Sequence, residues 1–145
     1  MTSTKRIIII GATSGIGNEV ARLYIKQGWR IGVAGRRLER LEELHAEAPD
    51  QIETIQLDVT CPDAPERLAE LIRKVGGMDV FLLSSGVGSQ NRALNPEIEL
   101  ATVQTNTVGF TRMVTAAYGY FKEHGGGQLA VISSIAGTKG LGAAP

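Results

Sequence analysis

The sequence lacks the features of several large protein classes. Cys61 is the only cysteine among 145 residues, which excludes a disulfide within the chain and favours a reducing compartment. No cluster of His and Cys has the spacing of a metal site, so we expect no metal. Lys plus Arg and Asp plus Glu number 15 each, so no net charge attracts nucleic acid or an anionic membrane.

Long hydrophobic runs are also missing. The apolar run at residues 7–10 is too short for the core of a signal peptide, and nothing approaches the roughly 18 apolar residues of a membrane span. We therefore expect a cytoplasmic protein with neither a membrane nor a nucleic acid as partner. Since 43% of the residues are hydrophobic, 145 residues suffice for one domain with a real core.

The most informative segment joins a strand, a glycine-rich turn and a helix. Four isoleucines at residues 7–10 are typical of a strand buried on both faces of a parallel sheet. The turn has a G-x-x-x-G-x-G spacing and consists of Gly11, Ala12, Thr13, Ser14, Gly15, Ile16 and Gly17. An amphipathic helix is expected from Asn18 to a stop near Gly28. Because a helix N-terminus has unpaired N–H groups and partial positive charge, this turn is suited to a phosphate, although any strand-to-helix turn can be rich in glycine.

Strands and helices alternate along the rest of the chain. Further strands are expected over residues 30–34, 52–57, 79–83 and 129–132, with helices between them, the last over residues 96–123. This order predicts an α/β fold with a doubly wound, Rossmann-type parallel sheet of five strands. Ligands bind such sheets beyond the carboxyl ends of the strands, and polar or glycine residues follow all five strands here.

Taken together, these features resemble the short-chain dehydrogenase/reductase family along the whole chain. The turn has the spacing typical of that family, which differs from the common G-x-G-x-x-G fingerprint. The resemblance implies a dinucleotide cofactor bound by the glycine turn and by Ser85 and Gly86 after the fourth strand. Family members usually have Asn-Asn-Ala-Gly at that point, whereas this chain has Leu83-Ser84-Ser85-Gly86. The asparagine contacts are therefore missing or replaced by serine hydroxyls.

The residues after the second strand indicate which dinucleotide binds. An NAD site usually has Asp or Glu there, but here Gly35, Arg36 and Arg37 follow the strand and the first carboxylate is Glu39. Arginine can donate charge-assisted hydrogen bonds to a 2′-phosphate, so the sequence favours NADP(H). Arg36 matches the basic position of NADP-preferring family members, and Arg37 is a second candidate. The alternative is that both arginines only begin a surface helix.

Asp58 and Val59 follow the third strand. The resemblance gives Asp58 the position that contacts the adenine, where a carboxylate can accept from the exocyclic amine, and Val59 offers apolar contact to the ring. An aspartate that caps the turn after Leu57 would look the same in the sequence.

Two further residues resemble catalytic positions of the family. Ser134, before Ile135-Ala136-Gly137, matches the serine that binds the substrate oxygen, and Asn106 matches the helix asparagine that supports the proton relay. Asparagine is poor in a helix interior because its side chain competes for backbone hydrogen bonds, so Asn106 followed by Gly109 predicts a local distortion. The alternatives are an ordinary turn serine and a partly exposed polar helix position.

The resemblance also implies a catalytic tyrosine and lysine, which would fall near positions 147 and 151 by count from Ser134. Tyr24, Tyr118 and Tyr120 lie in predicted helices and match nothing catalytic. We therefore expect residues 1–145 to be an incomplete NADP-binding domain, the N-terminal part of a longer enzyme without its C-terminal elements, and inactive alone.

The implied activity is that of an NADP(H)-dependent oxidoreductase that interconverts a small-molecule carbonyl and an alcohol by hydride transfer. The helix over residues 96–123 resembles one that packs between subunits in the family, which implies a homodimer or homotetramer. A non-catalytic dinucleotide-binding module or sensor is the alternative, because it needs the cofactor residues but neither the tyrosine nor the lysine. An extended-type relative, such as a nucleotide-sugar epimerase, would instead show a G-x-x-G-x-x-G spacing.

Overall fold

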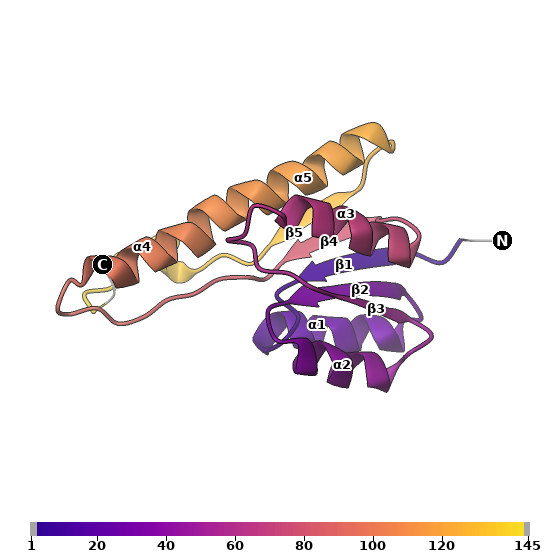
Figure 1. The fold of residues 1–145 in the computed structure, drawn as a ribbon, viewed down its shortest axis with the longest axis horizontal. Coiled ribbons are helices and arrows are strands. Elements are labelled where there is room, and N and C mark those ends of the chain that lie inside the picture. The colour runs from indigo at the N-terminus through magenta and orange to yellow at the C-terminus, as the bar shows by residue number, and fades with distance from the viewer. Residues whose placement is uncertain (1–2, 144–145) are drawn as a thin grey trace.

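A computed structural model describes residues 3–143. Five parallel strands form one sheet in the order β3-β2-β1-β4-β5, and helices cover both of its faces (Figure 1). The strands are β1 (Arg6–Ile10), β2 (Arg30–Gly35), β3 (Ile52–Gln56), β4 (Val80–Leu83) and β5 (Gln128–Val131). The helices are α1 (Gly15–Lys26), α2 (Leu38–Glu47), α3 (Ala64–Val75), α4 (Pro96–Val103) and α5 (Phe110–Glu123). This is the doubly wound, Rossmann-type α/β sheet that the sequence predicts.

The isoleucines of β1 explain why this strand lies at the centre of the sheet. Ile7 and Ile9 belong to the core beneath α1 and α2, whereas Ile8 and Ile10 belong to the core beneath α3 and α5 (Figure 1). All four side chains are at most 1% exposed. Because successive side chains of a strand point to opposite faces, a strand covered on both faces needs an apolar residue at every position.

Helix α3 shows how the sequence pattern places a helix on the sheet. Its buried residues recur at helical spacing, namely Ala64, Leu68, Leu71, Ile72 and Val75. Pro65 lies in the first turn, where a backbone N–H would have no partner within the helix, so its absence costs no hydrogen bond. The helix ends at Gly76, whose φ of +90° gives the left-handed cap that favours glycine.

The helix expected over residues 96–123 is present as one long rod (Figure 1). A π-helical turn, Gln104–Gly109, joins α4 to α5. Asn106 lies inside this turn, which confirms the predicted distortion. Helix α5 buries Met113, Ala117 and Phe121, whereas α4 has no buried residue. The rod therefore rests on the sheet through its second half only.

No helix within residues 3–143 has the length and apolar character that crossing a bilayer requires.

Candidate functional site

An open pocket lies at the carboxyl ends of the strands. It spans the point between β1 and β4 where the strand order reverses, which is the usual ligand position in doubly wound sheets. Ends of four strands and the π-helical turn contribute to it. The lining residues are Gly11, Thr13, Ser14, Gly35, Arg36, Arg37, Leu57, Asp58, Val59, Ser84, Ser85, Gly86, Val87 and Thr105.

The glycine turn lies against the end of β4. Gly11 has a φ of +89°, and a Cβ on it would lie 2.7 Å from the backbone N of Ser85. Gly17 packs on the carbonyl oxygen of Gly11, so a side chain there would collide with the turn. Helix α1 begins at Gly15, three residues before the expected start at Asn18, so its unpaired N–H groups lie within the turn itself. A helix N-terminus within a glycine turn is suited to an anion, because its unpaired N–H groups can donate to it.

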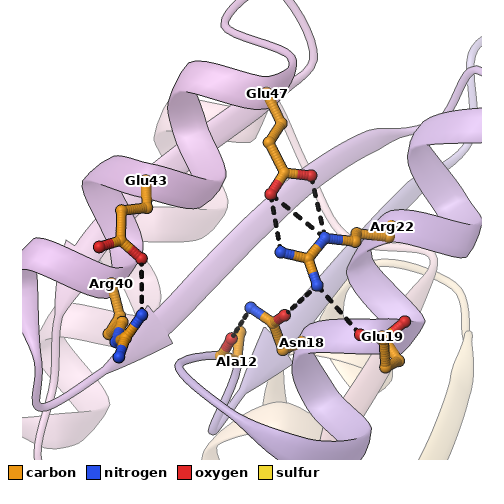
Figure 2. Close-up of polar contacts among 7 residues, drawn as sticks. All are labelled: Ala12, Asn18, Glu19, Arg22, Arg40, Glu43 and Glu47. Carbon is orange, nitrogen blue, oxygen red and sulfur yellow. Dashed lines mark hydrogen bonds and ion pairs between the residues drawn. The ribbon is translucent and has the colours of Figure 1, made fainter.

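A polar network anchors the glycine turn to α1 and α2 (Figure 2). Nδ2 of Asn18 donates to the carbonyl oxygen of Ala12 at 3.0 Å, and Oδ1 of Asn18 accepts from Arg22 at 2.7 Å. The same guanidinium binds both carboxylate oxygens of Glu47 on α2, with Nη2 to Oε1 at 2.8 Å. The hydrogen bonds from Arg22 lower the pKa of Glu47 below its ordinary value. Asn18 therefore also holds the turn, in addition to its predicted place in the helix.

Two arginines bring positive charge to the pocket. Nη2 of Arg37 donates to Oγ of Ser14 at 2.8 Å and to Oγ1 of Thr13 at 3.0 Å. Arg37 thus reaches across to the glycine turn rather than pointing away on a surface helix. Arg36 lines the same pocket, and its backbone carbonyl accepts from Nε2 of Gln56 at 2.8 Å. A cationic rim therefore stands at the end of β2.

Asp58 caps a turn and also lines the pocket. Its Oδ1 accepts from the backbone N of Thr60 at 2.9 Å and from the Thr60 hydroxyl at 2.7 Å. Burial by itself raises the pKa of Asp58, but the Thr60 hydrogen bonds and the Arg36 charge outweigh it, so the pKa is lowered. The turn-capping alternative is thus part of what this carboxylate does. Oδ2 accepts no hydrogen bond from any group in residues 3–143.

Asn106 holds the segment that follows β4. Its Oδ1 accepts from the backbone N of Val87 at 2.9 Å, and its Nδ2 donates to the carbonyl oxygen of Val87 at 2.6 Å. Within residues 3–143, Asn106 does not line the pocket, although Val87 and Thr105 do. The amide therefore acts on the pocket through the backbone that it holds.

Ser134 lies in a turn after β5. Its Oγ accepts from the backbone N of Ala136 at 3.1 Å and starts a short 3₁₀ turn, Ile135–Gly137. In the part of the chain that the structure describes, Ser134 does not line the pocket and makes no hydrogen bond to Asn106. The bond from Ala136 uses a lone pair, so the hydroxyl hydrogen can still be donated. The catalytic role of Ser134 stays a prediction.

The structure brings together most of the residues that the sequence singles out for a cofactor. Those that line the pocket are Gly11, Thr13, Ser14, Arg36, Arg37, Asp58, Val59, Ser85 and Gly86. Gly15, Ile16 and Gly17 instead form the start of α1. The sequence did not single out Leu57, Val87 or Thr105 for the site; the first two could have been found by their place at strand ends. Within residues 3–143 no group of three or more His, Cys, Asp or Glu side chains could hold a metal.

Comparison with known proteins gives consistent matches. The sequence model of the family described as short chain dehydrogenase matches residues 5–145. An uncharacterized oxidoreductase of Mycobacterium tuberculosis is 35% identical over 145 residues, covering 94% of this chain and 57% of the relative. An NADP-dependent 3-hydroxy acid dehydrogenase of Escherichia coli is 32% identical over 136 residues, covering 91% of this chain and 55% of the relative.

A solved structure extends this likeness to three dimensions. The crystal structure of an actinorhodin polyketide ketoreductase with NADPH superposes with a TM-score of 0.87 at 30% identity, covering 97% of this chain and 57% of that one. The chain therefore spans little more than half the length of the relatives that it matches.

Proposed function

The chain belongs to the short chain dehydrogenase family, and we propose that it forms the cofactor-binding part of an NADP(H)-dependent oxidoreductase that interconverts a carbonyl and an alcohol. One observation carries the proposal. The glycine turn packs against the end of β4, where the strand order of the sheet reverses. It lies beside the cationic rim of Arg36 and Arg37. The relatives named for NADP dependence and the ketoreductase with NADPH support the same cofactor.

The residues of the pocket suit an NADP(H) molecule in their charge and in their hydrogen-bonding groups. The amide groups at the start of α1 suit the pyrophosphate, because a helix N-terminus has unpaired N–H groups and partial positive charge. Arg36, Arg37 and the Ser14 hydroxyl suit the 2′-phosphate, and no acidic side chain follows β2 directly. Asp58 and Val59 suit the adenine, because Oδ2 of Asp58 accepts no hydrogen bond within residues 3–143.

The chemistry divides between the cofactor and the protein. NADPH, when bound, supplies the hydride. Ser134 donates its hydroxyl hydrogen to the substrate oxygen, and Asn106 keeps Val87 and the pocket wall in place. We assign the proton transfer to a tyrosine and a lysine near positions 147 and 151 of the longer protein, counted from Ser134. The chain alone is then expected to bind the cofactor without turnover.

Binding titrations test the cofactor assignment. The purified protein is titrated with NADPH and with NADH, and the change in nicotinamide fluorescence gives each Kd. We expect NADPH to bind at least about tenfold more tightly, because the 2′-phosphate gains charge-assisted hydrogen bonds. Equal affinity, or a preference for NADH, contradicts the assignment and makes the two arginines surface residues.

A non-catalytic dinucleotide-binding module is the second candidate. It is favoured by the position of Ser134, which lines no part of the pocket in residues 3–143, and by the serines in place of the asparagines after β4. The test is an assay of a protein that extends past residue 151, with NADP⁺ and a panel of 3-hydroxy acids and simple alcohols. Turnover that Ser134→Ala lowers with unchanged NADPH affinity supports the enzyme. Sequence past residue 145 without the tyrosine and lysine supports the module.

We also propose that the whole protein is a cytoplasmic homodimer or homotetramer. The single cysteine, Cys61, is free and exposed, which suits a reducing compartment. The α4–α5 rod carries exposed apolar side chains, among them Leu100 and Tyr118, each 63% exposed. Sedimentation of the whole protein tests the assembly, and a monomer at all concentrations contradicts it.

A further inference from the structure

A guanidinium on α5 binds the backbone of a residue in the pocket wall. Nη1 of Arg112 donates to the carbonyl oxygen of Val59 at 2.6 Å, across 53 residues of sequence. Val59 is 5% exposed and lines the pocket beside Asp58. We propose that Arg112 is a positioning residue that fixes the adenine side of the cofactor pocket. This inference rests on the proposed function, because the adenine is assigned to Asp58 and Val59 there.

A second contact places the same helical rod against Val59. A Cβ on Gly109 would lie 2.6 Å from Cγ2 of Val59 and 3.2 Å from its carbonyl oxygen. Gly109 ends the π-helical turn, and Arg112 lies about one helical turn further along the rod. The absence of a side chain at residue 109 thus lets the rod approach Val59 closely. Arg112 then secures the carbonyl from the next turn.

The hydrogen bond from Arg112 matters because residues 58–60, which follow β3 and Leu57, otherwise make hydrogen bonds only within the connection itself in the part of the chain that the structure describes. Thr60 binds the Asp58 side chain, and the backbone N of Cys61 donates to the carbonyl oxygen of Asp58 at 3.0 Å. Within residues 3–143, the Arg112 bond is the one that joins Asp58, Val59 or Thr60 to another part of the fold. A charged donor makes a stronger hydrogen bond than a neutral one. Without it, the backbone of the adenine wall would be anchored by packing alone.

Arg112→Met tests this role because methionine keeps length and apolar packing but has no donor. Adenosine 2′,5′-bisphosphate is the probe, since it presents the adenine and the 2′-phosphate without the nicotinamide. Calorimetry of the purified protein gives its Kd, and thermal unfolding gives the folded fraction used to correct it. We expect the Kd to rise about tenfold in Arg112→Met, the order of a hydrogen bond to a charged group. Arg112→Lys, which keeps one cationic donor, should recover part of the affinity.

Arg67→Met is the matched control. Arg67 also donates to a backbone carbonyl near the end of β3, with Nη1 at 3.2 Å from the oxygen of Gln56, but Gln56 does not line the pocket. This variant should therefore leave the Kd of the bisphosphate within about twofold of the wild type. Equal Kd values for wild type and Arg112→Met overturn the inference, as does an equal loss in Arg67→Met. Failure of the wild type to bind the bisphosphate or NADPH instead contradicts the proposed function.

Discussion

The side-chain amide of Asn106 pairs with both backbone groups of Val87, 19 residues earlier in the chain. One side chain thereby satisfies a donor and an acceptor of the segment after β4, as a neighbouring strand would. The amide comes from the π-helical turn Gln104–Gly109. Short π-helical segments often occur at functional sites, and here the turn stands beside the pocket wall.

Asn106→Asp should loosen this pairing. The aspartate keeps one acceptor for the Val87 N–H, but its second oxygen faces the Val87 carbonyl oxygen and repels it. We expect the free energy of unfolding to fall by about 1 kcal/mol, together with faster hydrogen exchange at the Val87 amide. Asn95→Asp is the control, since Oδ1 of Asn95 accepts from the backbone N of Glu97 at the start of α4 and that acceptor is kept. An equal loss in both variants would show that the paired amide at residue 106 contributes nothing.

Arg37→Met should weaken NADPH binding and leave NADH binding nearly unchanged. Arg37 is held by Ser14 and Thr13 at the glycine turn, so its charge is already in place for a 2′-phosphate. We expect the Kd of NADPH to rise about tenfold, consistent with the loss of a charge-assisted hydrogen bond. Fluorescence titration with both dinucleotides measures the change.

Arg40→Met is the control for Arg37. Its guanidinium binds Glu43 on the same helix at 2.9 Å rather than the glycine turn (Figure 2). Removing it should change neither Kd by more than about twofold. A similar loss in both variants would mean that general positive charge, rather than the position of Arg37, attracts the cofactor.

The fold could be predicted because its signals are local. The isoleucines of β1 and the leucines of α3, which recur at helical spacing, indicate buried positions from only a few residues of sequence. The sequence predicts that α1 begins at Asn18, whereas it begins at Gly15, because a glycine-rich turn carries no apolar periodicity. Boundaries of this kind depend on backbone angles that composition does not reveal.

The site was predictable only in part because several of its contacts join distant segments. The distortion at Asn106 follows from a local rule. The hydrogen-bond partner of the Asn106 side chain, Val87, instead depends on how the α4–α5 rod packs on the sheet. The bond from Arg112 to Val59 crosses 53 residues and leaves no pattern in the sequence. Asp58 is hard to assign for a different reason. An aspartate at this position can either cap the turn or contact an adenine, and the sequence is the same in both cases; in the structure the carboxylate does cap the turn.

Asp79 should make stability depend on pH at the acid end. Arg6 donates to this carboxylate through its backbone N at 2.8 Å, Nε at 3.0 Å and Nη2 at 2.9 Å, joining the starts of β1 and β4. The hydrogen bonds from Arg6 lower the pKa of Asp79 below its ordinary value. A lowered pKa in the folded state stabilises the protein above the ordinary value of about 3.9, and this contribution is lost as the pH falls through the folded-state pKa.

Asp79→Asn is therefore expected to lower the free energy of unfolding at neutral pH and to matter less in acid. Both side chains are about a third exposed, so solvent screening limits the loss near pH 7 to about 1 kcal/mol. Urea unfolding at several pH values between about 3 and 7 measures the difference from the wild type. Glu43→Gln removes an exposed pair with Arg40 and should show little change at any pH. A constant Asp79→Asn difference down to the lowest pH contradicts the ionic origin.

The same substitution, glycine to alanine, should have opposite effects at two positions of the long rod. At Gly119 no atom lies within 4 Å of the added Cβ, so Gly119→Ala should raise the free energy of unfolding by about 0.5–1 kcal/mol through helix propensity. At Gly109 the Cβ would lie 2.6 Å from Cγ2 of Val59, and overpacking of this kind usually costs about 1–3 kcal/mol. Gly109→Ala should therefore destabilise despite the better helix former.

Urea unfolding of the two variants measures the opposite signs directly. Val59→Ala combined with Gly109→Ala sharpens the test, because removing the Val59 methyl groups removes Cγ2, the atom nearest to the new Cβ, and leaves only Cβ at 3.0 Å and the carbonyl oxygen at 3.2 Å. The free energy of unfolding should fall less in the double variant than the sum of the two single losses, because the effects of substitutions at residues in contact are not additive. Additive losses, or a Gly109→Ala variant as stable as Gly119→Ala, would mean that the rod does not pack tightly on the Val59 side chain at Gly109.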